Sequence, residues 1–283
     1  MRQMPRCIFV CAVLFAAHTA LASAGCRTIS GFEQYLSQAR GVVVGDLHGT
    51  VEAPAFVASL VCNLAHSGHP VVLGLEYPVD EQHYLDEFLR SPTDNLQPAL
   101  LSSPFWNRST QDGRTSRAMF DLLGSVRQQV REGARIRVVA FDARPITGLS
   151  GTPAFDARDA AMAEHLRHKL SNLRAGEIPV IFTGNVHARK TKGLLATNAP
   201  PGMENAEPLG YRIRDLKYLH LDIGYRGGSL WTCDSPTHCG VQVIGEPGAA
   251  VATFAILPPA KPAYDAQYFV GTVTASPPAV TAK

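Results

Sequence analysis

Four short apolar runs, each rich in β-branched residues, constrain the fold of this chain more than any other feature. They are Val42–Val44, Val71–Leu73, Ile136–Val139 and Val180–Phe182. Runs of this length without polar alternation are typical of parallel strands that are buried on both faces. Between them, Glu52–His66 and Phe155–Leu173 place apolar residues on one face at helical spacing. The pattern predicts an α/β fold in which helices flank a largely parallel central sheet.

The spacing of the runs predicts an insert after the second strand. The first two runs fit a single βαβ unit, whereas the second and third are much farther apart. We expect helices over Asp80–Arg90 and Thr115–Arg131, which either cover a substrate or form a packed surface excursion. After Leu194, short segments bounded by Gly and Pro predict a strand-rich closing section. A single domain is expected over residues 25–257, followed by a proline-rich tail over 258–283.

The first 24 residues have the pattern of a secretory signal peptide. Two arginines precede an apolar run over Cys7–Ala17, and Ala22–Ala24 is a small-residue cleavage site. The run is too short for a membrane helix, which needs about 20 apolar residues. We therefore expect a secreted or periplasmic protein with no stable membrane span. Without Met1–Ala24 the basic and acidic side chains are equal in number, and this lack of a basic field argues against nucleic acid as a partner.

Cysteine usage agrees with export. After the expected cleavage, four cysteines remain: Cys26, Cys62, Cys233 and Cys239. An even number in an oxidising compartment predicts disulfides. Cys233 and Cys239 enclose a turn-rich segment and are expected to pair, which leaves Cys26 to pair with Cys62. The alternatives are a zinc site at Cys233, His238 and Cys239, and lipid attachment at Cys26.

Ionisable side chains follow all four apolar runs. They are Asp46 and His48 after the first run, Glu76 after the second, Asp142 and Arg144 after the third, and His187 after the fourth. The carboxyl ends of parallel strands lie along one edge of a sheet, where ligands bind, so these side chains are expected to converge. The candidate catalytic residues are Asp46, His48, Glu76 and His187. The candidate substrate contacts are Asp142, Arg144, Glu52 and Arg189.

Two chemistries suit this set of residues. His48, Glu76 and His187 are a usual ligand set for zinc, manganese, cobalt or iron, and the metal would then activate water. Alternatively, a histidine such as His48, oriented by Asp46 or Glu76, acts as a general base without a metal, and His187 or Arg144 stabilises the developing negative charge. Both chemistries indicate a hydrolase that acts on a small-molecule or peptide substrate.

Three segments carry a resemblance to a known superfamily: GDLHGTVEAPAF, VVLGLEYP and FTGNVHARK. The chain resembles the superfamily that joins the ChaN haem-uptake proteins, the Tiki proteases and the erythromycin-esterase-like enzymes. The matching features are a Gly-x-x-His that ends at His48, a Glu at position 76, and a second Gly-x-x-His that ends at His187. The closing segment TFAILPPAKPAYDAQYFVGTVTASP also resembles the final strand of this superfamily. The resemblance implies an α/β fold with its site at the strand ends. It also implies metal-dependent proteolysis, histidine-activated ester hydrolysis or haem binding.

The resemblance leaves two alternatives to this kind of hydrolase. One is a haem- or iron-binding protein of the ChaN type without turnover, for which Tyr77 is the candidate haem ligand. The other is a calcineurin-like phosphoesterase, because VVVGDLHG is similar to the first metal motif of that family, with Asp46 and His48 as a ligand pair. The aspartate that bridges two metals in that family has no counterpart in this chain. Asp46 also stands where esterase and ChaN sequences commonly have Glu, so no role is transferred to it.

Overall fold

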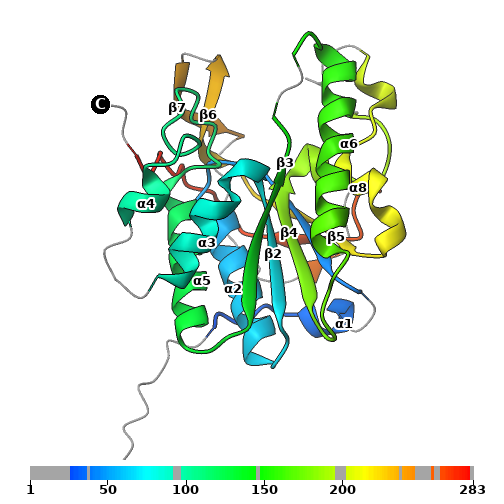
Figure 1. Cartoon of the computed structure of the whole chain (residues 1–283). Coiled ribbons are helices and arrows are strands. Elements are labelled where there is room, and N and C mark those ends of the chain that lie inside the picture. Colours follow the sequence, from blue (N-terminus) through cyan, green and yellow to red (C-terminus); the bar gives the residue numbers. More distant parts are fainter. Residues whose placement is uncertain are drawn as a thin grey trace, which may run out of the picture.

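The computed structural model describes residues 26–36, 39–91, 97–144, 147–194, 202–235, 238–245, 256–257 and 262–280. The expected signal peptide lies outside these residues. Helices cover both faces of a seven-stranded sheet (Figure 1). The sheet strands are β1 (Val42–Asp46), β2 (Val71–Pro78), β3 (Ile136–Asp142), β4 (Ile178–Gly184), β5 (Leu219–Gly224), β8 (Ile256–Leu257) and β9 (Ala266–Phe269). Their order is β3-β2-β4-β1-β5-β9-β8, and neighbouring strands are parallel except for β8 and β9. The predicted α/β fold is confirmed.

The helices form two layers around this sheet. They are α1 (Phe32–Leu36), α2 (Glu52–His66), α3 (Gln82–Arg90), α4 (Gln97–Leu101), α5 (Arg117–Arg131), α6 (Gly151–Leu170), α7 (Asn185–Ala188) and α8 (Leu209–Arg212). Helices α2, α3 and α5 share one hydrophobic core with one face of the sheet, and α6 and α8 share a second core with the other face (Figure 1).

Strand β1 shows why the apolar runs do not alternate with polar residues. Val42 and Val44 belong to the core beneath α2 and α5, whereas Val43 belongs to the core beneath α6. Successive side chains of a strand point to opposite faces, and both faces of this sheet are covered by helices. All three valines are therefore fully buried.

The predicted helical insert between β2 and β3 consists of α3, α4 and α5. Its apolar residues join the core on the α2 side, and Trp106 is fully buried there. Helix α5 begins after Ser116, whose hydroxyl accepts a hydrogen bond from Met119 N at 3.4 Å. Just before this cap, the loop carries Arg114 to the carboxyl edge of the sheet. The insert is therefore packed against the domain and also contributes a residue to that edge.

The segment after residue 257 differs from the expected tail. Ala266–Phe269 form β9, which pairs with β5 in parallel, and Tyr268 is almost fully buried. Farther on, Thr274 O accepts a hydrogen bond from Val51 N at 2.9 Å. The domain thus continues well past the predicted boundary, because a four-residue strand with two buried side chains is enough to join the sheet despite the prolines before it. Of residues 251–257, which fall in the expected strand-rich section, only Ile256 and Leu257 are described.

Both expected disulfides are present: Cys26 is bonded to Cys62, and Cys233 to Cys239. The bonded sulfur atoms contradict the zinc and lipid alternatives. Cys233 and Cys239 face each other in an antiparallel hairpin of β6 (Gly228–Ser235) and β7 (His238–Ile244). Disulfides fit the expected export to an oxidising compartment. In the described part of the chain, every helix is too short or too polar to cross a bilayer.

Candidate functional site

Glu76, at the end of β2, lies at the centre of a buried polar cluster on the carboxyl edge of the sheet. The strand order places β4 beside β2, and β4 supplies two donors to this carboxylate. Glu76 Oε2 accepts hydrogen bonds from Thr183 Oγ1 at 2.6 Å and from Gly184 N at 2.8 Å. The side chain is only 4% exposed. The neighbouring strand therefore fixes one oxygen of Glu76 and leaves the other free for charged partners.

Two arginines bind the second oxygen of Glu76. Arg158 Nη2 lies 2.7 Å from Glu76 Oε1, and Arg114 Nη1 lies 3.2 Å from it. The same two groups donate to Asp142 Oδ2, at 2.8 Å and 2.7 Å. Burial opposes ionisation of Glu76, but the positive charges of His48 and Arg158 hold its pKa well below the usual range. Two guanidinium groups and two carboxylates thus form a charge-balanced buried cluster, which satisfies the partners that buried charges require.

His48 lies between two carboxylates. Its Nδ1 is 2.9 Å from Asp46 Oδ1, and its Nε2 is 3.4 Å from Glu76 Oε2. Burial alone would lower the pKa of His48, but Asp46 and Glu76 raise it to about 10. Burial also raises the pKa of Asp46. At neutral pH the His48 ring therefore carries a proton on each nitrogen, and its Nε2 proton faces Glu76.

His187 has the opposite protonation at the nitrogen that faces the cluster. Its Nδ1 lies 2.9 Å from both oxygens of Asp159, and its Nε2 lies 3.0 Å from Arg158 Nη1. A guanidinium only donates hydrogen bonds, so Nε2 must be unprotonated and Nδ1 must hold the proton. Asp159 is fully buried and also accepts a hydrogen bond from Leu209 N at 2.6 Å. Phe155 stacks on the imidazole, with ring centroids 5.2 Å apart.

These groups open into a cavity of about 400 Å³. The hairpin of β6 and β7 supplies part of its wall through Leu230, Thr232 and Gln242. A second cavity of about 580 Å³ lies alongside. Arg114 and Arg158 line both cavities. A ligand bound in the larger cavity can therefore reach the two guanidinium groups at the histidine site.

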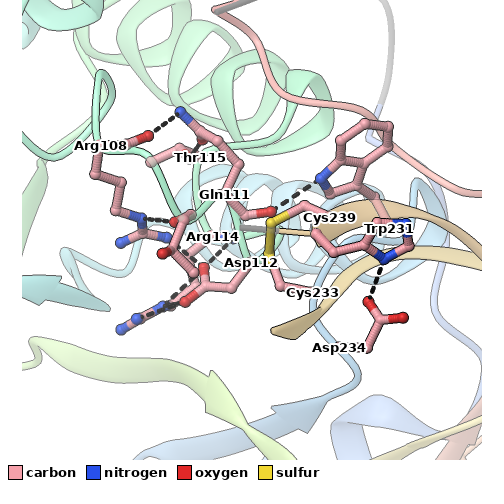
Figure 2. Close-up of a disulfide and its surroundings, with 11 residues drawn as sticks. Arg108, Gln111, Asp112, Arg114, Thr115, Trp231, Cys233, Asp234 and Cys239 are labelled. Atoms are coloured by element: carbon pink, nitrogen blue, oxygen red, sulfur yellow. Dashed lines mark hydrogen bonds and ion pairs between the residues drawn. A yellow bond between two sulfur atoms is a disulfide. The ribbon is translucent and has the colours of Figure 1, made fainter. Parts of the chain in front are cut away.

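The loop that carries Arg114 is held by the disulfide-bonded hairpin (Figure 2). Trp231 Nε1, on β6, donates a hydrogen bond to Gln111 O at 2.9 Å. Within the loop, Asp112 Oδ2 accepts from Arg114 Nη2 at 2.7 Å. Gly113 has a φ of +90°, and a Cβ at this position would lie 2.3 Å from Gly49 N. The approach of this loop to the loop after β1 therefore depends on glycine.

The structure brings together five of the eight sequence-predicted site residues: Asp46, His48, Glu76, Asp142 and His187. Both expected Gly-x-x-His motifs contribute their histidine. The glycine of the second motif allows close packing, since a Cβ on Gly184 would lie 3.2 Å from His48 Nε2. Convergence follows from the sheet order, because β3, β2, β4 and β1 are consecutive neighbours that all end at this edge.

The other three predicted site residues lie outside the cluster. Arg144 pairs with Asp80, and its side chain is 78% exposed at the rim of the larger cavity. Glu52 Oε2 accepts a hydrogen bond from Thr274 N at 2.9 Å, and Arg189 Nε donates one to Gly193 O at 3.0 Å. Glu52 and Arg189 therefore hold backbone segments in place. The guanidinium groups at the cluster belong instead to Arg114 and Arg158.

The proposed haem ligand Tyr77 is enclosed by the insert. Its side chain is 1% exposed, and its ring centroid lies 4.8 Å from that of Phe105 and 6.1 Å from that of Trp106. Burial raises the pKa of its hydroxyl. An axial haem ligand needs an open face beside it for the porphyrin. The packing of Tyr77 contradicts that assignment, because adjacent residues of a strand point to opposite faces and only Glu76 points into the site.

Sequence reasoning missed Arg114, Arg158 and Asp159. Arg158 and Asp159 lie in the third turn of α6, the helix that follows β3. A helix that follows a parallel strand begins at the carboxyl edge of the sheet, so polar residues in its first turns were detectable candidates. Arg114 lies in the insert, and its position depends on contacts with the distant hairpin, for which the local sequence contains no signal.

The expected metal ligands do not fit a metal ion in this arrangement. Arg158 Nη1 faces Nε2 of His187 at 3.0 Å, and two guanidinium groups bind Glu76 Oε1. These positive groups lie where a cation would bind. Within the described ranges, one set of three potential ligands has donor atoms close to one another: Cys26, Cys62 and His66. The two sulfur atoms of this set are bonded to each other.

Comparison with known proteins identifies the fold. No protein-family model matches the sequence, and no curated protein matches it significantly. Among solved structures, a variant of the erythromycin esterase EreC in an open conformation matches with a TM-score of 0.57 and 14% identity, over 78% of this chain and 81% of that chain. The chain shares the fold of erythromycin esterase.

Two further structures have the same fold. A protein from Bacillus cereus matches with a TM-score of 0.62 and 12% identity, over 87% of this chain and 91% of that chain. A succinoglycan biosynthesis protein matches with a TM-score of 0.65 and 9% identity, over 88% of this chain and 94% of that chain. The erythromycin-esterase fold that the sequence resemblance implied is therefore confirmed, and at these identities the likeness concerns the fold.

Proposed function

We propose that this protein is a hydrolase that uses two histidines, without a bound metal, to add water to a small substrate that contains an ester or amide bond. The observation that carries the proposal is the placement of two histidines on either side of Glu76, one held between two carboxylates and the other with its Nε2 facing a guanidinium. His48 Nε2 lies 3.4 Å from Glu76 Oε2, and His187 Nε2 lies 4.0 Å from Glu76 Oε1. When two groups in one pocket are held in different protonation states, the protonated group can act as the acid and the unprotonated group as the base.

In this mechanism His187 is the general base. Water that displaces the Nη1 contact of Arg158 meets the free lone pair of His187 Nε2, which takes its proton as the oxygen attacks the substrate carbonyl. Asp159 keeps the ring in the tautomer that this step needs and stabilises the positive charge that forms on it. Arg158 remains bound to Glu76 and Asp142 through its other nitrogens.

His48 is the general acid. It holds a proton on Nε2 at neutral pH and donates it to the leaving group when the carbonyl–heteroatom bond breaks. Arg114 and Arg158 stabilise the negative charge on the tetrahedral intermediate, in a site where little water screens them. The proton that His187 gains equals the one that His48 loses, and exchange with solvent restores both rings.

The test is hydrolysis of chromogenic esters and of small amides and lactones by protein that has been dialysed against EDTA. Because each histidine transfers a proton in the reaction, His48→Gln and His187→Gln should each lower kcat by about 100-fold or more. The matched control is His168→Gln, on the exposed side of α6, which should keep wild-type activity. Full activity in either site variant would contradict the assignment. Activity that disappears in EDTA and returns with zinc or manganese would contradict the metal-free mechanism.

A further inference from the structure

The disulfide between Cys26 and Cys62 has a histidine side chain against it. His66 Nδ1 lies 3.0 Å from Cys26 Sγ and 3.7 Å from Cys62 Sγ. Cys62 and His66 are one turn apart on α2, and Cys26 reaches them from the segment before α1. We propose that this disulfide is a thiol–disulfide exchange site, activated by His66, that accepts electrons from a dithiol reductant.

The surroundings of the disulfide make exchange possible. His66 is exposed and the two cysteines are partly exposed, so a reductant can approach from solvent. The ring is also held in place, because Nδ1 lies 3.1 Å from Cys62 O, one turn earlier on the helix. A positively charged imidazole beside a sulfur atom stabilises the thiolate that forms when the disulfide opens. Of the two sulfurs, Cys26 Sγ is closer to the ring and is therefore the better leaving group.

The second disulfide is an internal control for this effect. Cys233 and Cys239 also have a histidine nearby, since His238 precedes Cys239. The ring of His238, however, pairs through Nδ1 with Asp234 Oδ1 at 3.0 Å. Of these two histidines, His66 has its ring nitrogen 3.0 Å from a disulfide sulfur, whereas the ring nitrogen of His238 is paired with Asp234.

The exchange proceeds in two balanced steps. A thiolate of the reductant attacks Cys62 Sγ, which forms a mixed disulfide with Cys62 and releases Cys26 as a thiolate beside His66. The second thiol of the reductant then loses its proton and attacks the mixed disulfide. This attack closes the disulfide of the reductant and releases Cys62 as a thiolate, which takes up the proton. Two electrons pass from the reductant to the Cys26–Cys62 pair, so the reductant is oxidised and this pair is reduced.

Opening this disulfide leaves the rest of the fold connected. Ile29 and Phe32, which follow Cys26, are buried in the core beneath α2. Asn63 Nδ2 also donates a hydrogen bond to Arg27 O at 2.8 Å. These contacts keep the two cysteines near each other after reduction, so oxidation can close the same disulfide again.

The test uses the full exported chain and reduced dithiothreitol at pH 7. Samples are quenched with acid, free thiols are alkylated, and each disulfide is followed by peptide mass spectrometry. Cys26–Cys62 should open faster than Cys233–Cys239. Because His66 stabilises the leaving thiolate, His66→Asn should slow its opening by about threefold to tenfold.

The variants separate the ring contact from other effects. His66→Asn should leave the opening rate of Cys233–Cys239 unchanged, and the control His238→Asn should leave that of Cys26–Cys62 unchanged. Unchanged thermal unfolding of His66→Asn in the oxidised state verifies that the fold is intact. Equal opening rates of Cys26–Cys62 in wild type and His66→Asn would overturn the proposal. Slower opening of Cys26–Cys62 than of Cys233–Cys239 in the wild type would also overturn it.

Discussion

Arg158 Nη2 lies 2.7 Å from Glu76 Oε1, although the two residues are 82 positions apart in the sequence. The same guanidinium contacts Asp142 and His187. One side chain from α6 thus joins the ends of β2, β3 and β4. Because its planar group uses all three nitrogens at once, a lysine cannot reproduce these contacts.

Arg158→Lys should therefore lower kcat strongly, by about 100-fold, because the remaining charge cannot reach Glu76, Asp142 and His187 together. Steady-state kinetics on the ester found to be the best substrate provides the measurement. Arg167→Lys is the matched control, since Arg167 lies on the same helix and pairs with Asp215 at the surface. Equal activity of the two variants would argue against a role for Arg158 in charge stabilisation.

Asp159→Asn should lower kcat by at least about 100-fold while KM changes little, because an amide at this position can turn His187 into the tautomer with Nε2 protonated. The control is Asp121→Asn, because Asp121 is exposed and pairs with Arg117 on α5. NMR of the His187 ring nitrogens would report the tautomer directly. If Nδ1 keeps its proton in Asp159→Asn, Asp159 does not set the tautomer.

The pKa of His48 gives stability a pH dependence with a definite sign. It is about 10 in the folded protein, compared with an ordinary value of 6.5. The stabilisation from this group is therefore complete below pH 6.5 and is lost as the pH rises through 10. Because the side chain is 24% exposed, solvent screening reduces the effect, and the free energy of unfolding should fall by about 1–3 kcal/mol between pH 7 and pH 10.

Urea unfolding of wild type and His48→Gln at both pH values isolates this contribution, since other groups titrate equally in the two proteins. The difference in stability between them should shrink at the higher pH. The hydrolase activity should also decline near pH 10, because His48 then loses the proton that it donates. A difference in stability that grows with pH would show that His48 is not held protonated by Asp46 and Glu76.

Gly113→Ala should abolish activity and destabilise the protein by about 3 kcal/mol or more, because the new Cβ would clash with the backbone of Gly49. Gly133→Ala separates the clash from backbone strain. Gly133 has a similar φ of +98°, but its Cβ would meet nothing within 4 Å. This control should cost about 1 kcal/mol and retain activity. Equal costs for the two substitutions, measured by urea unfolding, would show that the Gly113–Gly49 contact does not hold the loop.

The sheet and five of the candidate site residues could be predicted because their signals are local. In β1, consecutive valines indicate burial on both faces, and Asp46 and His48 follow directly in the sequence. Arg158 and Asp159 carry a weaker signal, their position near the start of the helix after β3, because an Arg-Asp pair on a helix most often faces solvent. Their burial depends on how α6 sits at the strand ends, which is a tertiary property.

The resemblance pointed to a final strand in the closing segment, but the pairing of β9 with β5 and the position of Arg114 could not be predicted, for a related reason. Ala266–Phe269 is too short to show periodicity and follows a proline-rich stretch, so its place beside β5 depends on pairing across 45 positions. Arg114 reaches the site because its loop is held by the hydrogen bond between Trp231 and Gln111. Sequence patterns report neighbours along the chain, whereas these two features depend on partners that are distant in the sequence.

Residues far downstream of His48 anchor the loop that presents it. Gly49 O, next to His48, accepts hydrogen bonds from Trp231 N at 2.9 Å and from Ser276 N at 2.8 Å. The loop that presents His48 therefore has two backbone partners in segments that are synthesised long after it. A chain truncated before Trp231 holds every proposed acid, base and arginine but lacks both backbone donors that anchor this loop. The loop is thus fully anchored only after Ser276 has been made.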